Sequence, residues 1–434
     1  MKFLSEKLGV APEKQRLILV AYFVFFVTGM SSTILGIIIP NLREAYGLNY
    51  LVSGSLFTLH QTGNLCAVIL AGFLPYLIGR KKTVTILYSG LAIGTILITA
   101  TGFPILLMAA YGLTGVGRGT TSNITNVIVS ESSENKGAGL NLLHAIFAFG
   151  ALVSPFILLL CSSALGSQGW RLTLWILALC MIVSFFLFAT SSLNNKPETK
   201  SSAAKTVQPS SESSSQAENA LSSENPFYKS FDYWLNVSIL LFYLCGESGN
   251  MGWLVTYFKD TGLMGQTFAQ MTSSIMWIMI MAGRIIAATI SGKVNKSLMI
   301  LTLAVLNTGF FILMISTRSM PLIIAGLLGT GLSMSGIYPT TLSTMKRGYN
   351  SSPLSTGFAI GIALVGGISM PVTAGAIAEK VTSSALAQGL STAEAENAGV
   401  SSGISAIAVA LSIMLILTLI KFIRERKSSN PKFS

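Results

Sequence analysis

Long apolar runs, separated by short polar segments rich in glycine and proline, dominate the chain. The stretch from Leu17 to Ile39 is apolar except for hydroxyl residues and glycines, and the stretch from Ile404 to Ile420 has the same character. A hydrocarbon core of about 30 Å needs about 20 helical residues. Runs of this length therefore predict membrane-spanning helices rather than helices in the core of a soluble protein.

The pattern predicts twelve such helices, and hence an all-α polytopic membrane protein built as two six-helix bundles. The first six are expected near 17–40, 51–78, 83–102, 104–130, 138–161 and 171–190. The second six are expected near 233–258, 267–292, 297–317, 321–345, 354–378 and 402–423. The shortest predicted break is Gly102-Phe103-Pro104, which requires a very tight turn.

Residues 191–230 differ from everything around them. They contain twelve serines with scattered lysine and glutamate, and almost no bulky apolar residue before Pro226. Such a composition cannot bury a core and is typical of a flexible linker. The sequence therefore predicts three parts: an N-terminal bundle (1–190), a cytoplasmic linker (191–230) and a C-terminal bundle (231–434).

Charge supports a membrane location and indicates the orientation. Only 10% of residues are charged and 51% are hydrophobic, whereas soluble domains carry about 25% charged residues. With both termini cytoplasmic, the inside segments hold 21 Lys and Arg and the outside segments five. This asymmetry follows the positive-inside rule. We expect a multi-pass protein of the plasma (inner) membrane with the lipid bilayer as its partner, and a monomer.

The net charge of +12 does not indicate nucleic-acid binding, because the basic residues sit in short loops between apolar runs rather than on one patch. The segment before the first apolar run is polar, and that run is too long for a cleavable signal. The four cysteines lie inside apolar segments without metal-ligand or disulfide spacing, so we expect them to pack as small hydrophobes.

Glycines and prolines repeat between the two halves of the chain. Gly63 and Gly72 are nine residues apart, as are Gly283 and Gly292, at an offset of 220. Thr114-Gly115 matches Thr330-Gly331 at an offset of 216, and Gly150 with Pro155 matches Gly366 with Pro371 at the same offset. Two related six-helix halves predict a solute site at the membrane midplane, reached alternately from each side.

Glu247 is the one acidic residue deep inside a predicted helix. Tyr243, Glu247 and Asn250 are spaced i, i+4 and i+7, which places them on one helix face. An ionisable group at the bilayer centre costs about 2.5–3.5 kcal/mol or more unless it is paired or hydrated. Two interpretations stay open: Glu247 carries a coupled proton, or it forms a fixed pair with Arg284 on the next helix.

The remaining polar residues inside helices are candidates for solute contact. Arg118 cannot deprotonate, so it either holds a carboxylate or donates to solute oxygens. Two arginines against one glutamate leave a positive charge, which favours an anionic or hydroxyl-rich solute. For His60 a solute contact, a proton relay and a plain interhelical hydrogen bond are all open, and for Trp277 and Tyr338 stacking on a solute and packing are both open. The other candidates for solute binding or coupling are Gln61, Asn64, Asn126, Asn141 and His144.

The loop after the second predicted helix, from Gly72 to Gly79-Arg80-Lys81-Lys82, resembles the signature loop of the major facilitator superfamily. Tyr76 stands where that family usually has an aspartate. Three further stretches resemble the fucose-permease-like branch of sugar:proton symporters: Asn141-Leu-Leu-His144 with Gly150 and Pro155, Gly246-Glu247 with Trp253, and Trp277 with Gly283-Arg284. The Gly336-Ile-Tyr-Pro339 segment is compatible with them. The acidic residues of that branch in helices 1 and 4 are missing, and helix 4 has Arg118 instead.

We therefore expect a secondary active transporter rather than an enzyme, moving a sugar, polyol or organic anion with a proton, or with Na⁺. No phosphate-binding loop, nucleophile–base pair or metal-ligand cluster is recognisable, so no cofactor or metal is expected. The main alternative is a proton-driven efflux carrier for amphipathic compounds. A membrane sensor without transport is a third hypothesis, but the linker and tails are too short and polar for a signalling domain.

Overall fold

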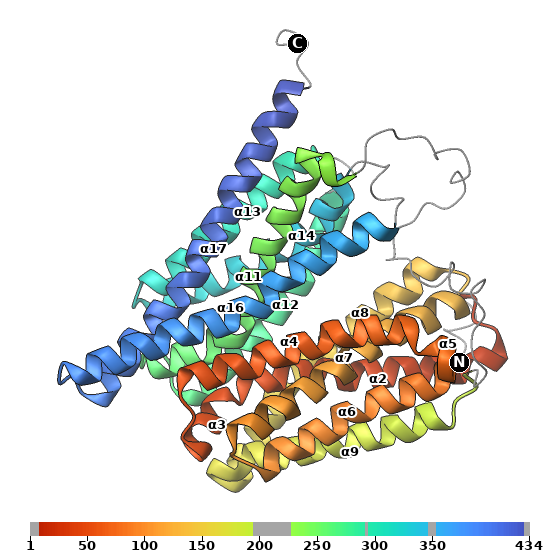
Figure 1. Cartoon of the computed structure of the whole chain (residues 1–434), viewed down its shortest axis with the longest axis horizontal. Coiled ribbons are helices and arrows are strands. Elements are labelled where there is room, and N and C mark those ends of the chain that lie inside the picture. Colours follow the sequence, from red (N-terminus) through yellow and green to blue (C-terminus); the bar gives the residue numbers. More distant parts are fainter. Residues whose placement is uncertain (1–7, 194–226, 291–293, 346–352, 429–434) are drawn as a thin grey trace. The chain divides into compact units, whose positions relative to one another are not determined.

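The computed structural model describes residues 8–193, 227–290, 294–345 and 353–428. Most of these residues are helical, with twelve helices of 21 to 37 residues among them. The chain divides into two compact units, Met1–Glu212 and Ser213–Ser434 (Figure 1). The predicted linker 191–230 lies mostly outside the described residues, as does Gly292.

The described residues of unit 1 form six long helices and three short ones. They are α2 (Pro12–Ile37), α3 (Ile39–Tyr46), α4 (Tyr50–Phe73), α5 (Pro75–Ile78), α6 (Arg80–Ala100), α7 (Pro104–Ser132), α8 (Lys136–Leu165), the 3-10 turn η1 (Gly166–Gln168) and α9 (Gly169–Ala189). Unit 2 contains the 3-10 turn η2 (Phe227–Lys229), α11 (Phe231–Asp260), α12 (Gln266–Ile290), α13 (Lys296–Ser316), α14 (Met320–Thr344), α16 (Pro353–Ala387) and α17 (Thr392–Ser428). The twelve predicted helices are therefore confirmed.

Several boundaries differ from the predictions for local reasons. The first two predicted helices each divide in two, α2/α3 and α4/α5, because Pro40 and Pro75 lack the N–H that would continue the hydrogen-bond ladder and instead begin new short helices. The predicted break after the third helix is confirmed, since α6 ends at Ala100 and α7 begins at Pro104.

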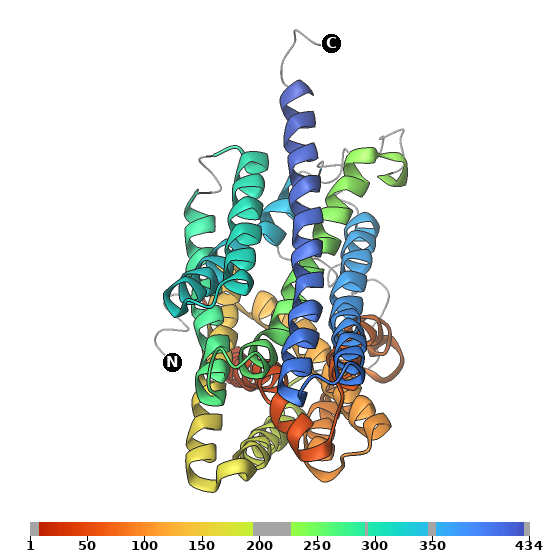
Figure 2. The ribbon, with the colours of Figure 1, turned by 90° about the vertical axis from the view of Figure 1, so that its left-hand side faces the viewer.

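The last helix is much longer than the predicted 402–423. Its additional N-terminal turns are rich in alanine and glutamate, which favour helix without being apolar. Hydropathy identifies only the part of a helix that suits lipid, so these turns escaped prediction. The C-terminal turns of α17 extend beyond the neighbouring helices of unit 2 (Figures 1 and 2).

Many large apolar side chains are exposed on the outer surfaces of the helices. Leu160, Ile105 and Ile69 are each about two-thirds exposed, at 68%, 67% and 65%. A water-soluble protein rarely exposes large apolar surface of this kind. Eight stretches of the described residues are long and apolar enough to cross a membrane, one of them running from Leu142 to Ala189 through both α8 and α9. The exposed aliphatic side chains are therefore suited to contact lipid.

The repeated glycines make equivalent contacts in the two units. In unit 1, Gly63 of α4 packs against the backbone of Gly112 in α7, and Gly150 of α8 packs against the backbone of α2. In unit 2, Gly283 of α12 packs against the backbone of Leu332 in α14, and Gly366 of α16 packs against the backbone of α11. The repeat therefore marks the places where corresponding helix pairs approach most closely.

Candidate functional site

Close packing of α4 on α7 positions the polar residues of unit 1. A Cβ atom on Gly115 would lie 3.0 Å from the backbone nitrogen of Asn64 and still closer to the carbonyl oxygen of His60. Only glycine allows the two backbones to approach this closely. The helices are therefore held in a register that places His60 and Gln61 beside the polar residues of α7.

Two hydrogen bonds cross this helix pair. His60 Nδ1 lies 2.9 Å from Thr114 Oγ1, and the His60 side chain is buried. The Arg118 guanidinium donates from Nη1 to Gln61 Oε1 at 3.1 Å, where both side chains are half-buried. The interhelical bond considered for His60 is thus present. Arg118 contributes a permanent positive charge to the middle of the bundle.

Two of the other predicted residues of unit 1 contact their own helix or a neighbouring one. The Asn126 amide donates to the carbonyl oxygen of Ser122 at 2.6 Å, one turn back along α7. His144 on α8 is exposed and contacts Phe25 of α2 edge-on, with ring centroids 5.6 Å apart. The Asn141 side chain lies outside the described part of the structure.

Unit 2 gathers a second polar cluster from α11, α12 and α14. Tyr243 is buried and hydrogen-bonds the Glu247 side chain one turn along α11, while Arg284 of α12 acts on the same phenol electrostatically. The Tyr243 and Tyr338 rings lie 5.8 Å apart at 45°, which brings α14 into the cluster. Tyr243 and Tyr338, 95 positions apart in sequence, thus both lie close to Glu247, the one carboxylate predicted to lie deep in a helix.

Asn250 completes the face of α11 predicted from the i, i+4, i+7 spacing. Its side chain is only 1% exposed, and both its amide nitrogen and its carbonyl oxygen lack a hydrogen-bond partner among the described residues. A buried amide left unsatisfied is costly and is normally bonded to protein or water. Asn250 is therefore able to bond a water molecule or a polar ligand entering from the Glu247 side of the helix.

Trp277 of α12 is half-buried and lies six residues before Gly283, the glycine at which α12 packs against α14. The structure thus groups Glu247, Tyr243, Tyr338 and Arg284, and separately Arg118 with Gln61. Asn64 is half-buried on α4, beside the close contact at Gly115.

The signature loop lies at one end of unit 1. Gly72 falls in the last turn of α4, and Gly79 adopts φ +84° between α5 and α6, a conformation open to glycine but strained for other residues. Arg80 then forms a 3.0 Å ion pair with Glu131 at the end of α7, and Lys81 donates to the carbonyl oxygen of Ser191 at 3.0 Å. The basic cluster therefore ties three helix ends together.

Sequence reasoning missed one buried charge. Lys421 falls in the last turn of the predicted helix 402–423 and was counted among the 21 basic residues of the inside segments, yet it is only 3% exposed in α17. Its Nζ donates to Asn236 Oδ1 of α11 at 2.5 Å and to Thr344 Oγ1 of α14. The only sequence signal was its position directly after the apolar run ending at Ile420, because nothing in the sequence indicates which helix ends surround it.

An all-helical chain of two units, with lipid-suited outer surfaces and isolated charges inside the bundles, has the architecture of a polytopic membrane transporter. The sequence matches the Major Facilitator Superfamily over residues 21–365, and the chain belongs to this family. It is therefore a multi-pass membrane transporter and not an enzyme.

Two curated relatives match most of the chain. A gallate transporter of Pseudomonas putida is 22% identical over 399 residues, covering 85% of this chain and 86% of that protein. A TsgA homolog of Edwardsiella ictaluri (strain 93-146) is 22% identical over 381 residues, covering 83% and 88%.

Solved structures have the same fold at low sequence identity. A bacterial homolog of the human lysosomal transporter Spinster, inward-facing and occupied, matches with a TM-score of 0.73 at 11% identity, covering 95% of this chain and 97% of that one. A mutant form of the nucleoside transporter NupG matches with a TM-score of 0.68 at 12% identity, covering 94% and 99%.

Proposed function

We propose that this transporter is a proton-coupled symporter that imports a small, oxygen-rich polar solute, with Glu247 as the proton-carrying group. The observation that carries the proposal is the cluster around Glu247. The Glu247 carboxylate, in the middle of α11, receives a hydrogen bond from the buried Tyr243 and interacts electrostatically with Tyr338, while Arg284 acts on the same Tyr243 phenol. A half-buried carboxyl group with both a phenol and a guanidinium nearby has an environment that changes if either neighbour moves.

The charge balance supports an acceptor-rich or anionic solute. Arg118 and Arg284 cannot release their protons, whereas Glu247 can. When Glu247 is protonated, the positive charge of Arg284 is no longer balanced within its cluster, and Arg118 carries a second permanent positive charge; guanidinium groups suit carboxylate and hydroxyl oxygens. Among sugars, polyols and organic anions, the relative named as a gallate transporter supports an organic anion. Asn250 and Gln61 offer amide groups that suit the hydroxyls of such a solute.

We propose that residues 1–190 and 231–434 move against each other by alternating access, with 191–230 as a cytoplasmic linker. The boundary between the two compact units falls within 191–230, which supports this division. The excess of Lys and Arg in the inside segments supports a plasma-membrane protein with both termini cytoplasmic. The resemblance of the motifs around Asn141, Glu247 and Trp277 supports membership of the fucose-permease-like branch. We expect the transporter to be a monomer.

Proton coupling is tested in proteoliposomes with Glu247→Gln, which keeps the size of the side chain but cannot exchange a proton. Test solutes are gallate, fucose and mannitol, chosen first by their effect on the melting temperature of the purified protein. Wild type should accumulate its solute on an inward proton gradient, and Glu247→Gln should lose accumulation while retaining solute exchange. Glu13→Gln, at an exposed position in the first turn of α2, is the matched control.

Unchanged accumulation by Glu247→Gln would remove Glu247 from the coupling role. Solute expulsion driven by the same gradient in wild type would instead establish the efflux alternative. Equal accumulation with and without the proton gradient, but dependent on Na⁺, would replace the coupling ion.

A further inference from the structure

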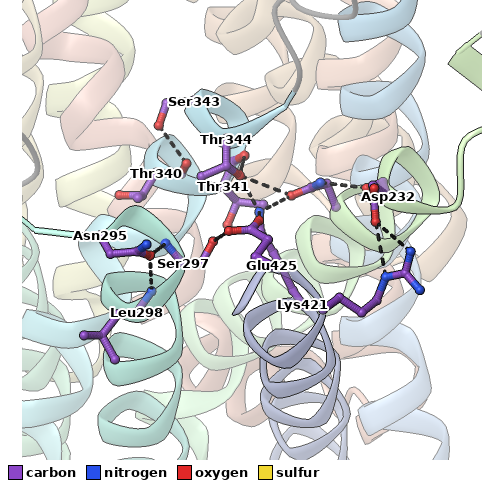
Figure 3. A network of polar contacts seen from close by, with 12 residues as sticks. Asp232, Asn295, Ser297, Leu298, Thr340, Thr341, Ser343, Thr344, Lys421 and Glu425 are labelled. Atoms are coloured by element: carbon purple, nitrogen blue, oxygen red, sulfur yellow. Dashed lines mark hydrogen bonds and ion pairs between the residues drawn. The ribbon is translucent and has the colours of Figure 1, made fainter. Parts of the chain in front are cut away.

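One end of unit 2 contains a pocket that the proposed transport cycle does not use. It has a volume of about 680 Å³ and is formed by the first turns of α11 and α13 and the last turns of α14 and α17. Small-molecule sites have volumes of roughly 300–1,000 Å³. Figure 3 shows the polar side chains that meet here from these four helices.

The charged residues lining this pocket are mostly basic. Four cationic side chains face two carboxylates: Lys296, Lys421, Arg424 and Lys427 against Asp232 and Glu425. The pocket thus has an excess of two positive charges. Both carboxylates are already engaged, because Asp232 pairs with Arg424 at 3.3 Å and Glu425 accepts a hydrogen bond from Ser297. The available charge is therefore positive.

Two of the cations are fixed in place. Lys421 is held by Asn236 and Thr344 and lies 3.9 Å from Glu425 Oε1. The Arg424 guanidinium stacks on the Phe231 ring, 4.5 Å from its centroid. An arginine carries five N–H donors, and its contacts with Asp232 leave others for a second acceptor. Because these two cations are already ordered, they add little to the entropic cost of binding an anion.

The other two cations are exposed. In the part of the chain that the structure describes, neither Lys296 nor Lys427 forms an ion pair. The first-turn amides of α13 are not available to a ligand, since Asn295 Oδ1 already accepts from Ser297 N and Leu298 N. Binding would therefore rest on side-chain cations rather than on the helix terminus.

We propose that this pocket binds a phosphate-bearing anion, through Lys296 and Lys427 with Arg424 and Lys421 as the fixed floor. Lysine and arginine are the side chains that bind phosphate groups. The Phe231 ring, on which the pocket residue Arg424 stacks, is 58% exposed and suited to contact an acyl chain. The phosphate belongs either to the headgroup of an anionic lipid or to a soluble phosphate compound.

The test uses the full-length purified protein and two probes, phosphatidylglycerol and inorganic phosphate, with phosphatidylcholine as the zwitterionic reference. Binding is measured by native mass spectrometry and by the shift in melting temperature on titration. The variant is Lys296→Gln with Lys427→Gln, which removes the two exposed cations. The matched control is Lys82→Gln with Arg426→Gln, which removes two exposed basic residues that do not line the pocket.

A contact between one basic side chain and the phosphate of an anionic lipid contributes about 1 kcal/mol, which is about fivefold in affinity. The pocket variant should therefore bind phosphatidylglycerol about 25-fold more weakly than wild type, and the control variant within about twofold of it. If the protein binds phosphatidylglycerol but not inorganic phosphate, the site belongs to a lipid. If inorganic phosphate displaces phosphatidylglycerol, the site belongs to a soluble phosphate compound. Equal binding of both lipids, or equal losses in the two variants, would overturn the proposal.

Discussion

Replacing Gly115 by alanine tests how far the close approach of α4 and α7 builds the polar centre of unit 1. The added Cβ would lie 2.8 Å from the carbonyl carbon of His60 and 3.0 Å from the amide nitrogen of Asn64. Nonbonded carbon atoms prefer about 3.5–4.0 Å. Since the obstructing atoms are backbone, no side-chain rotation relieves the contact. The two helices must separate by about 1 Å.

This separation determines the energetic cost. Overpacking of a close interface costs about 1–3 kcal/mol. A shift of about 1 Å also lengthens the 2.9 Å bond from His60 to Thr114 and the 3.1 Å bond from Arg118 to Gln61 beyond hydrogen-bond range. Each lost bond costs about 1 kcal/mol. Alanine recovers about 1 kcal/mol of helix propensity, so the net destabilisation is about 2–4 kcal/mol.

The measurement is thermal unfolding of the purified protein in a mild detergent, and Gly309→Ala is the matched control. Gly309 is exposed in the middle of α13, and a Cβ there would meet nothing within 4 Å. The same substitution should therefore raise or preserve the melting temperature at Gly309 and lower it clearly at Gly115. A Gly115→Ala protein that melts at or above the wild-type temperature would refute the packing argument.

Three further predictions test the charges and the topology. Arg118→Lys keeps the charge but loses the planar donor that bonds Gln61 at 3.1 Å, so solute uptake should fall about tenfold with little change in melting temperature. Arg80→Gln should lower the free energy of unfolding by less than about 1 kcal/mol, because the Glu131 side chain of the 3.0 Å ion pair is 54% exposed. Melting temperatures at low and high salt check this, and a large loss of stability would contradict it. Gln388→Cys in a cysteine-free protein should react with an impermeant maleimide from outside only, and labelling from inside would reverse the proposed orientation.

The twelve helices and their membrane character could be predicted because both depend on local properties. Length and hydropathy decide whether a segment suits lipid, and each can be counted along the chain. The errors were local as well: Pro40 and Pro75 end helices within otherwise apolar runs, and α17 continues through polar, helix-favouring turns before and after its lipid-suited part. The glycine repeat predicted that the halves correspond, and its members mark equivalent helix contacts.

The partners of the polar residues could not be predicted in the same way. The spacing of Tyr243, Glu247 and Asn250 placed them on one helix face, but only the packing of α11 with α12 and α14 brings Tyr338 and Arg284 to that face. His60 bonds a residue 54 positions away, and Lys421 bonds one 185 positions away.

Such pairs depend on how each helix is rotated about its axis and where it crosses its neighbours. Rotation and crossing are set by close contacts between distant segments, such as the one at Gly115. The sequence alone thus determined which segments suit a membrane and most of the charges that lie within them, Lys421 being the exception. The tertiary structure decided which of those charges meet, because a helix turned by a fraction of a turn presents different residues to the same neighbour.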